Sequence, residues 1–275
     1  MQLVKTEQTK ANKEKIMSNL GLKDSKDLDL KDFEHRYGAN NEIVCLTEIH
    51  GPESGAERIM LGLGDRIPLW TPNSTLFWRF DERSMQRFSY PDQAKAHFRE
   101  LIDGAMDMWG DAAPVKFQEA PPGSPLTDID FFYGLTPGND CNPNGGCVMA
   151  SAFFPSQNIE RLWVFPKLLE TDKSYQFDVM AHELGHIFGL RHYFAKEKEA
   201  KLPAVVFGEH SKFSIMNYGS DSMLTETDRR DLALFYTKVW NREITQVGDM
   251  NIDLVIPRSS ISPSHGYGAS VLGVT

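Results

Sequence analysis

Three histidines stand close together in the sequence at spacings that suit a metal site. His182 and His186 are four positions apart, about one helical turn, so both imidazoles can reach one ion from the same helix face. Gly189 can adopt a positive φ and end the helix, which lets the chain turn back and bring His192 in as a third ligand. Three protein ligands leave a fourth position for water, as in a catalytic rather than a structural zinc site.

Glu183 directly follows the first of these histidines and points to the side of the metal. From there its carboxylate can hold a zinc-bound water and accept its proton. The residues from about Ser174 onward place apolar side chains on one side of a helix, with His182 and His186 on roughly the opposite side. We therefore expect this helix to pack on a core through one face and to present both imidazoles to a cleft.

Taken together, residues 182–192 spell H-E-x-x-H-x-x-G-x-x-H, which resembles the long zinc-binding signature of the metzincin metallopeptidases. Residues 214–219 (SIMNYG) are similar to the Met-turn of that clan, in which a methionine forms a hydrophobic floor beneath the zinc. The resemblance gives the floor to Met216 and structural support to Gly189. It also implies that Tyr218 binds zinc or stabilises the oxyanion, a role that suits a phenol. Without the upstream motif, the same segment would read as an ordinary turn beside the core.

The subfamily stays open at this point. The pattern S-I-M-x-Y-G most resembles the astacin and serralysin branches, but astacins usually follow the third histidine with Glu, where this chain has Tyr193. Matrixins place Tyr directly after the methionine, where Asn217 stands here. The histidine-based structural zinc of matrixins would also lack ligands, because no histidine lies between His97 and His182.

Apolar periodicity and turn residues outside the motif predict an α+β domain. Strands are expected at residues 74–80, 115–119, 127–133, 148–154 and 161–165. Helices are expected from Ser89-Tyr90-Pro91 to Gly110, across the zinc motif, and after Thr225-x-x-Asp228. This order resembles the metzincin catalytic domain, which implies a twisted, mostly parallel five-stranded sheet with an antiparallel edge strand, a backing helix, the zinc-site helix and a C-terminal helix.

Three regions follow from this resemblance and from composition. Residues 1–68 are predicted to be an N-terminal leader or pro-segment, and residues 69–240 the catalytic domain. Residues 241–275 form a C-terminal extension rich in Ser, Gly and Pro, which could wrap the domain, enter the cleft or stay mobile.

In the metzincin domain the antiparallel edge strand borders the cleft, and the matching segment here is residues 146–155. An exposed edge can bind an extended peptide through main-chain hydrogen bonds. The resemblance therefore implies substrate contacts at Met149, Ala150, Ser151 and Ala152. It also makes Tyr193, directly after the third histidine, a candidate wall of the specificity pocket.

Composition limits the partners and the compartment. The 275 residues are 41% hydrophobic and 24% charged, and the net charge is −9 with a pI near 5.4. This balance argues against nucleic acid or an anionic membrane as the main partner. No apolar run has the length of a transmembrane helix, and the polar, lysine-rich N-terminus shows no signal peptide. We expect a monomer that acts on a protein or peptide substrate; calcium dependence cannot be read from these residues.

The chain contains three cysteines. Cys141 and Cys147 flank Asn-Pro-Asn-Gly-Gly, a turn that could bring the two thiols within bridging distance. A disulfide, the favoured reading over two free thiols, indicates an oxidising compartment and, together with the protease type, an extracellular location. Cys45 or Asp65 could block the zinc in a latent form. However, neither surrounding sequence matches a known switch, and a buried Cys and a turn Asp are the alternative.

The predicted function is therefore a zinc-dependent endopeptidase with one catalytic zinc ion, in which Glu183 activates the attacking water. Two alternatives remain open: a zinc-binding regulatory protein without turnover, and a zinc hydrolase acting on a non-peptide amide. The intact Glu183 argues against the first, and the predicted peptide-binding edge argues against the second.

Overall fold

The structure is a computed structural model that describes residues 43–44, 60–61, 66–134, 147–192, 205–207, 214–217 and 222–261. Its centre is a five-stranded sheet in the order β5-β4-β6-β9-β8. Its strands are β4 (Thr75–Phe80), β5 (Lys116–Glu119), β6 (Ile129–Tyr133), β8 (Ala150–Ser151) and β9 (Glu160–Val164). All neighbouring pairs are parallel except β8 with β9, which is antiparallel and forms one edge of the sheet.

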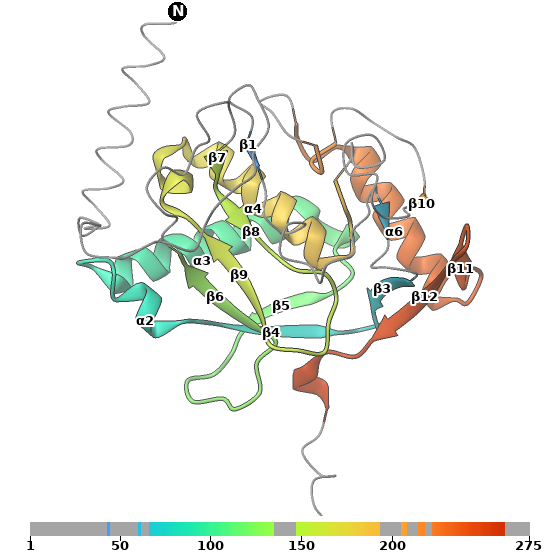
Figure 1. Ribbon diagram of the computed structural model, residues 1–275, viewed down its shortest axis with the longest axis horizontal. Coiled ribbons are helices and arrows are strands. Elements are labelled where there is room, and N and C mark those ends of the chain that lie inside the picture. Colours follow the sequence, from blue (N-terminus) through green and yellow to red (C-terminus); the bar gives the residue numbers. More distant parts are fainter. Residues whose placement is uncertain are drawn as a thin grey trace, which may run out of the picture.

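Two long helices lie on the same side of this sheet (Figure 1). They are α3 (Pro91–Trp109) and α4 (Lys173–Ile187). The alternation of β4 buries Leu76, Trp78 and Phe80, and the apolar stripe of α3 includes the fully buried Phe98 and Leu101. A third helix, α6 (Glu226–Trp240), begins with a capping box formed by its N-cap residue and the third helical residue. The shorter helices are α2 (Glu82–Met85), η1 (Gly110–Ala112), η2 (Pro166–Glu170) and η3 (Arg258–Ser260).

Three smaller sheets join distant parts of the chain. β3 (Arg66–Trp70) pairs in parallel with β12 (Met250–Val255), which also pairs antiparallel with β11 (Gln246–Val247). β1 (Ile43–Val44) pairs in parallel with β7 (Cys147–Val148). β2 (Met60–Leu61) pairs antiparallel with β10 (Val205–Val206). Strands before residue 71 therefore pair with strands from the middle of the chain and from its C-terminal part.

These observations confirm the expected α+β architecture, including the mostly parallel sheet and its antiparallel edge. The single strand predicted at residues 148–154 is wrong, because two short strands with different partners, β7 and β8, stand in its place. Strand β3 is an addition that local sequence did not predict. It crosses the expected boundary at residue 68, and its partner β12 lies in the expected C-terminal extension.

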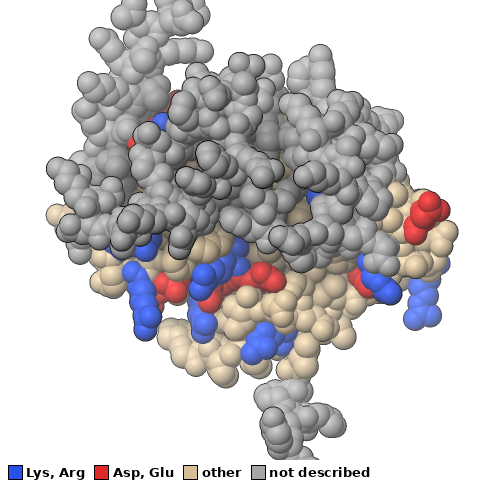
Figure 2. Space-filling view, viewed as in Figure 1, with Lys and Arg blue, Asp and Glu red and all other residues tan. Residues whose placement is uncertain are grey.

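Acidic and basic side chains are interspersed on the described part of the surface visible in Figure 2. Several form exposed or half-exposed ion pairs, among them Arg79–Asp130, Lys95–Glu82 and Arg99–Glu119. Among the described residues, no helix is both long and apolar enough to cross a membrane.

Candidate metal centre

The three predicted ligands converge on one point. The Nε2 atoms of His182 and His186 are 3.1 Å apart, and each lies 3.2 Å from Nε2 of His192. Within the described part of the chain, these residues form the group of His, Cys, Asp or Glu side chains that could hold a metal ion. The spacing of the motif and the geometry of the fold therefore agree on the same three residues.

The opposite ring nitrogens explain why the Nε2 atoms face one another. Nδ1 of His182 lies 2.7 Å from the carbonyl oxygen of Ile215, and Nδ1 of His186 lies 2.8 Å from that of Leu190. A carbonyl oxygen can only accept, so each Nδ1 carries the proton and each Nε2 presents a lone pair. Bonds of this kind fix the orientation and tautomer of histidine ligands in metal sites.

Zinc suits this arrangement. A tetrahedral ion bound to imidazole nitrogens at the usual distance sets those nitrogens about 3.3 Å apart. The observed separations of 3.1–3.2 Å are close to this value. The Nε2 lone pairs of His182 and His186 would repel one another at this distance without a cation between them. The arrangement of the nitrogens therefore suits a bound metal ion.

The site is buried. His182 is 7% exposed, Glu183 1%, and both His186 and His192 0%. The sequence predicts imidazoles that border a cleft, whereas the structure encloses this face of α4. One physical reason is that α4 is packed on two sides: Trp109 of α3 donates a hydrogen bond to the carbonyl of Ala181, and the Met-turn carbonyl reaches His182.

The predicted Met-turn is held by one buried carboxylate. Asp228, in the first turn of α6, accepts a hydrogen bond from Ser214 Oγ at 2.6 Å and one from the backbone N–H of Ile215 at 3.3 Å. Ser214 Oγ in turn accepts from the backbone N–H of Met216 at 3.1 Å. Because the carbonyl of Ile215 bonds to His182, Asp228 fixes the backbone that orients a metal ligand.

An aromatic ring lies between the metal centre and a buried cation. The ring of Phe154 meets His186 edge-on at 5.6 Å, and the guanidinium of Arg191 lies 5.4 Å from the centre of the same ring. Arg191 itself is 3% exposed. No local sequence pattern predicts this contact, because Phe154 and Arg191 are far apart along the chain.

The structure describes some of the remaining predicted residues and not others. Met149, Ala150 and Ser151 are buried in and beside the edge strand β8, which packs against α4, and Ala152 follows it half-buried. Met216 is buried, and Gly189 has a φ of +90°, as predicted for the helix end. The predictions for Tyr193, Tyr218, Cys45, Asp65 and Cys141 fall outside the described residues, and Cys147 is described only as part of β7.

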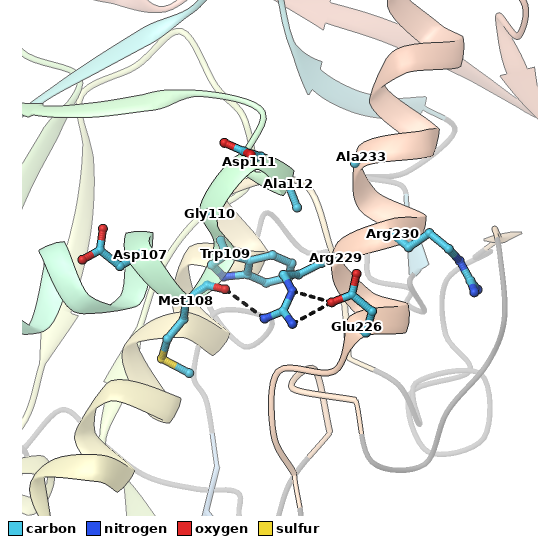
Figure 3. Close-up of a pocket in the computed structure, with 10 residues that line it drawn as sticks. All are labelled: Asp107, Met108, Trp109, Gly110, Asp111, Ala112, Glu226, Arg229, Arg230 and Ala233. Atoms are coloured by element: carbon cyan, nitrogen blue, oxygen red, sulfur yellow. Dashed lines mark hydrogen bonds and ion pairs between the residues drawn. The ribbon is translucent and has the colours of Figure 1, made fainter.

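A pocket of about 410 Å³ lies elsewhere, between the end of α3 and the start of α6 (Figure 3). Arg229 points across it, donating to the carbonyl of Met108 and to the carboxylate of Glu226. None of the three histidines lines this pocket. We interpret it as a gap in the packing between α3 and α6, which Arg229 bridges.

Comparison with known proteins assigns the family. The family model described as matrixin (Peptidase_M10) matches residues 69–222, just over half of the chain. The chain belongs to the matrixin family. Matrixins are metzincin metallopeptidases, so the assignment confirms the clan expected from the zinc motif. It also selects the matrixin branch, although Asn217 rather than Tyr follows the methionine.

Curated relatives resemble only part of this matrixin chain. Rat macrophage metalloelastase is 33% identical over 108 residues, covering 37% of this chain and 23% of the relative. Human neutrophil collagenase is 31% identical over 139 residues, covering 46% of this chain and 27% of the relative. The chain thus spans about a quarter of the length of the relatives it matches.

Two solved structures also share a general likeness with this matrixin chain. Myroilysin is 16% identical and covers 64% of this chain and 98% of its own, with a TM-score of 0.42. The high choriolytic enzyme 1 of the medaka fish, described as a hatching-enzyme zinc protease, is 11% identical and covers 62% and 94%, with a TM-score of 0.40.

Proposed function

We propose that the chain is a zinc-dependent endopeptidase. The observation that carries this proposal is the triangle of Nε2 atoms 3.1–3.2 Å apart, with two of the Nδ1 atoms bonded to backbone carbonyls. His182, His186 and His192 would hold the zinc. A zinc ion in such a site supplies Lewis-acid chemistry, polarising a carbonyl oxygen and making water more acidic.

Glu183 would carry the proton. It follows His182 directly on α4 and is 1% exposed, so its carboxylate stands beside the ligands in a site largely closed to bulk water. A carboxylate oxygen there accepts a proton from the attacking water and then delivers it to the leaving amine. Tyr218 is proposed to stabilise the oxyanion through its hydroxyl group.

The substrate class follows from the edge of the sheet. β8 is the antiparallel edge strand and packs against α4, which carries two of the ligands. The side chains of Met149, Ala150 and Ser151 are buried, so this segment would offer a peptide its main chain rather than its side chains. We propose that an extended peptide pairs here, with Ala152 and Tyr193 beside it. The extracellular location and the Cys141–Cys147 bridge likewise remain predictions.

The test is zinc content together with cleavage of a quenched peptide library. The native chain should bind one zinc and cleave; Glu183→Gln should keep the zinc and lose cleavage by at least about 100-fold, as expected for loss of a general base. His186→Ala should lose the metal. Glu226→Gln, an exposed carboxylate on α6, is the matched control and should leave both unchanged.

Other outcomes would identify other functions. Bound zinc without cleavage of any peptide would favour a binding role. Cleavage that survives in the Glu183→Gln variant would refute the proposed proton carrier.

A further inference from the structure

The helix that carries two of the ligands ends in a Schellman motif. Phe188 is the C-cap of α4, and Gly189 follows with a φ of +90°. The N–H of Leu190 donates to the carbonyl of Gly185 at 2.9 Å, and the N–H of Gly189 donates to that of His186 at 2.8 Å. This is the pair of bonds that defines the motif. The carbonyls of Ile187 and Phe188, the last two of the helix end, then need hydrogen-bond donors from outside the helix.

Two buried aromatic side chains supply those donors. The indole Nε1–H of Trp70 donates to the carbonyl of Ile187 at 2.7 Å, and the hydroxyl of Tyr236 donates to the carbonyl of Phe188 at 3.0 Å. Tyr236 Oη also lies 3.3 Å from the backbone N–H of Trp70, from which it accepts. Both donors are 1% exposed, so water cannot easily replace either one.

The protonation state of Tyr236 fits a lasting role as donor. Burial raises the pKa of its hydroxyl well above the usual value for tyrosine. The hydroxyl therefore stays protonated at neutral pH. A buried carbonyl that loses such a partner is left unsatisfied, so loss of either donor destabilises this helix end.

The same turn orients one proposed ligand, His186, and leads to another, His192. Leu190 provides the carbonyl that holds Nδ1 of His186, and His192 follows two residues later. Gly189 also fits tightly, because a Cβ placed on it would stand 3.1 Å from the carbonyl oxygen of Pro68. Movement of the helix end would therefore displace one ligand and rotate another.

Trp70 is itself held from several directions. The carbonyl oxygen of Trp70 accepts a hydrogen bond from Nε1–H of Trp240 at 3.0 Å. Trp70 is also the partner of Val255 where β3 pairs with β12. The N–H of Thr71 donates to the carbonyl of Val255 at 3.0 Å. In Figure 1, β3, β12 and α6 lie together at one end of the molecule. Trp70 is thus held by α6 and by β12, although both elements lie beyond the residues matched by the family model.

We infer that Tyr236 and Trp70 are positioning residues for the metal centre, which cap the end of α4 and thereby fix the turn that carries Leu190 and His192. The inference rests on the proposed zinc site but not on peptide cleavage. In this role each residue acts through the backbone of the turn.

The decisive variant is Tyr236→Phe, which removes the hydroxyl and keeps the ring. The zinc dissociation constant, measured by competition with a chromogenic chelator, should rise by about 10-fold, the lower end of the range for partners outside the ligand shell. The absorption spectrum of the Co²⁺-loaded variant should change as well, because the third imidazole is less well fixed. Hydrogen exchange of the metal-free variant should increase at residues 187–192.

Ser84→Ala is the matched control. Its hydroxyl is also buried and makes two backbone hydrogen bonds, but it lies on α2, next to β6. This variant should lower the melting temperature and leave zinc affinity and the Co²⁺ spectrum unchanged. Trp70→Phe is a second test, and it should weaken zinc binding in the same direction as Tyr236→Phe.

The outcomes separate the two proposals. If the native chain binds zinc and Tyr236→Phe and Trp70→Phe bind it equally well, the positioning role is refuted while the zinc site stands. If zinc affinity falls by the same factor in Ser84→Ala, general loss of stability explains the effect and the inference fails. A native chain that binds no zinc would refute the proposed function, and this inference with it.

Discussion

Gly185 of α4 lies directly against Met216 of the Met-turn. A Cβ placed on Gly185 would stand 2.4 Å from Met216 Sδ and 3.4 Å from the ring of Trp109. The missing side chain therefore lets the methionine approach the helix between the two ligands His182 and His186. The position proposed for Met216 beneath the metal therefore depends on a glycine at one of the unspecified positions of the zinc motif.

Gly185→Ala should push Met216 aside, because a contact of 2.4 Å cannot persist. We expect a loss of about 1–3 kcal/mol in unfolding free energy, typical of overpacking a core, and weaker zinc binding. Urea denaturation and chelator competition measure the two effects. In a Met216→Ala background the same glycine substitution should cost much less; a double-mutant cycle without such coupling would contradict the steric explanation.

Asp228→Asn should loosen the Met-turn from α6. The carboxylate accepts hydrogen bonds from Ser214 Oγ, from the N–H of Ile215 and from Thr225. In asparagine, the NH₂ group would replace one acceptor oxygen and face some of these donors with its own N–H groups. Loss of hydrogen bonds to a buried charge predicts a cost of about 1.5–3 kcal/mol in stability. Asp253→Asn, which breaks an exposed pair with Arg66, is the control and should cost no more than about 1 kcal/mol. Equal losses in the two variants would refute the assignment.

The metal ligands could be predicted from sequence because the information is local. Helical spacing places His182 beside His186, and a glycine that ends the helix returns His192 to them. Periodicity likewise predicted α3 and α6, including the capping role of Thr225 and Asp228. A local pattern cannot show that one residue also has distant partners. Asp228 is an example, because it also accepts hydrogen bonds from Ser214 and Ile215.

The supports of the site were not predictable for a different reason. Trp70 and Tyr236 meet although 166 positions separate them, and Arg66 pairs with Asp253 across 187 positions. Strand β12 contains Asn251 and Asp253, which are poor strand formers, and its stability comes from pairing with β3. Contacts of this kind are fixed by tertiary packing, so the pattern of a short segment does not predict them.

Strand β1, in the predicted leader, lies next to the proposed substrate edge, and we expect it to interfere with substrate binding there. β1 pairs with β7 one residue before β8 begins. Replacing Ile43 and Val44 by proline removes two backbone donors and should release this edge. The KM for an extended peptide should then fall, with little change in kcat.

Strand β2 provides the control for that experiment. β2 pairs with β10, outside the five-stranded sheet, so prolines at Met60 and Leu61 should leave KM unchanged. A KM that falls equally in both variants would show that the leader acts as a whole. A KM that changes in neither would separate β1 from substrate binding.

A buried histidine outside the metal site predicts a pH dependence of stability. His97 on α3 lies with Nε2 2.8 Å from Gln176 Oε1 on α4, and burial lowers the pKa of His97 below 6.5. The nearby charge of Lys173 acts in the same direction, while the hydrogen bond and Glu100 oppose it. The unfolded chain therefore takes up the proton first as the pH falls. Stability should be complete above about pH 6.5 and should decline below it, down through the pKa of the folded state.

His97→Gln isolates this contribution, because glutamine does not titrate and its amide N–H can still donate to Gln176. Urea denaturation at about pH 7.5 and about pH 5.5 should show a smaller loss of stability in the variant than in the native chain. The comparison has to be made between the two proteins at each pH, so that contributions common to both cancel. Identical losses would mean that the ring is protonated as readily in the folded chain as in the unfolded one, contrary to its burial between α3 and α4.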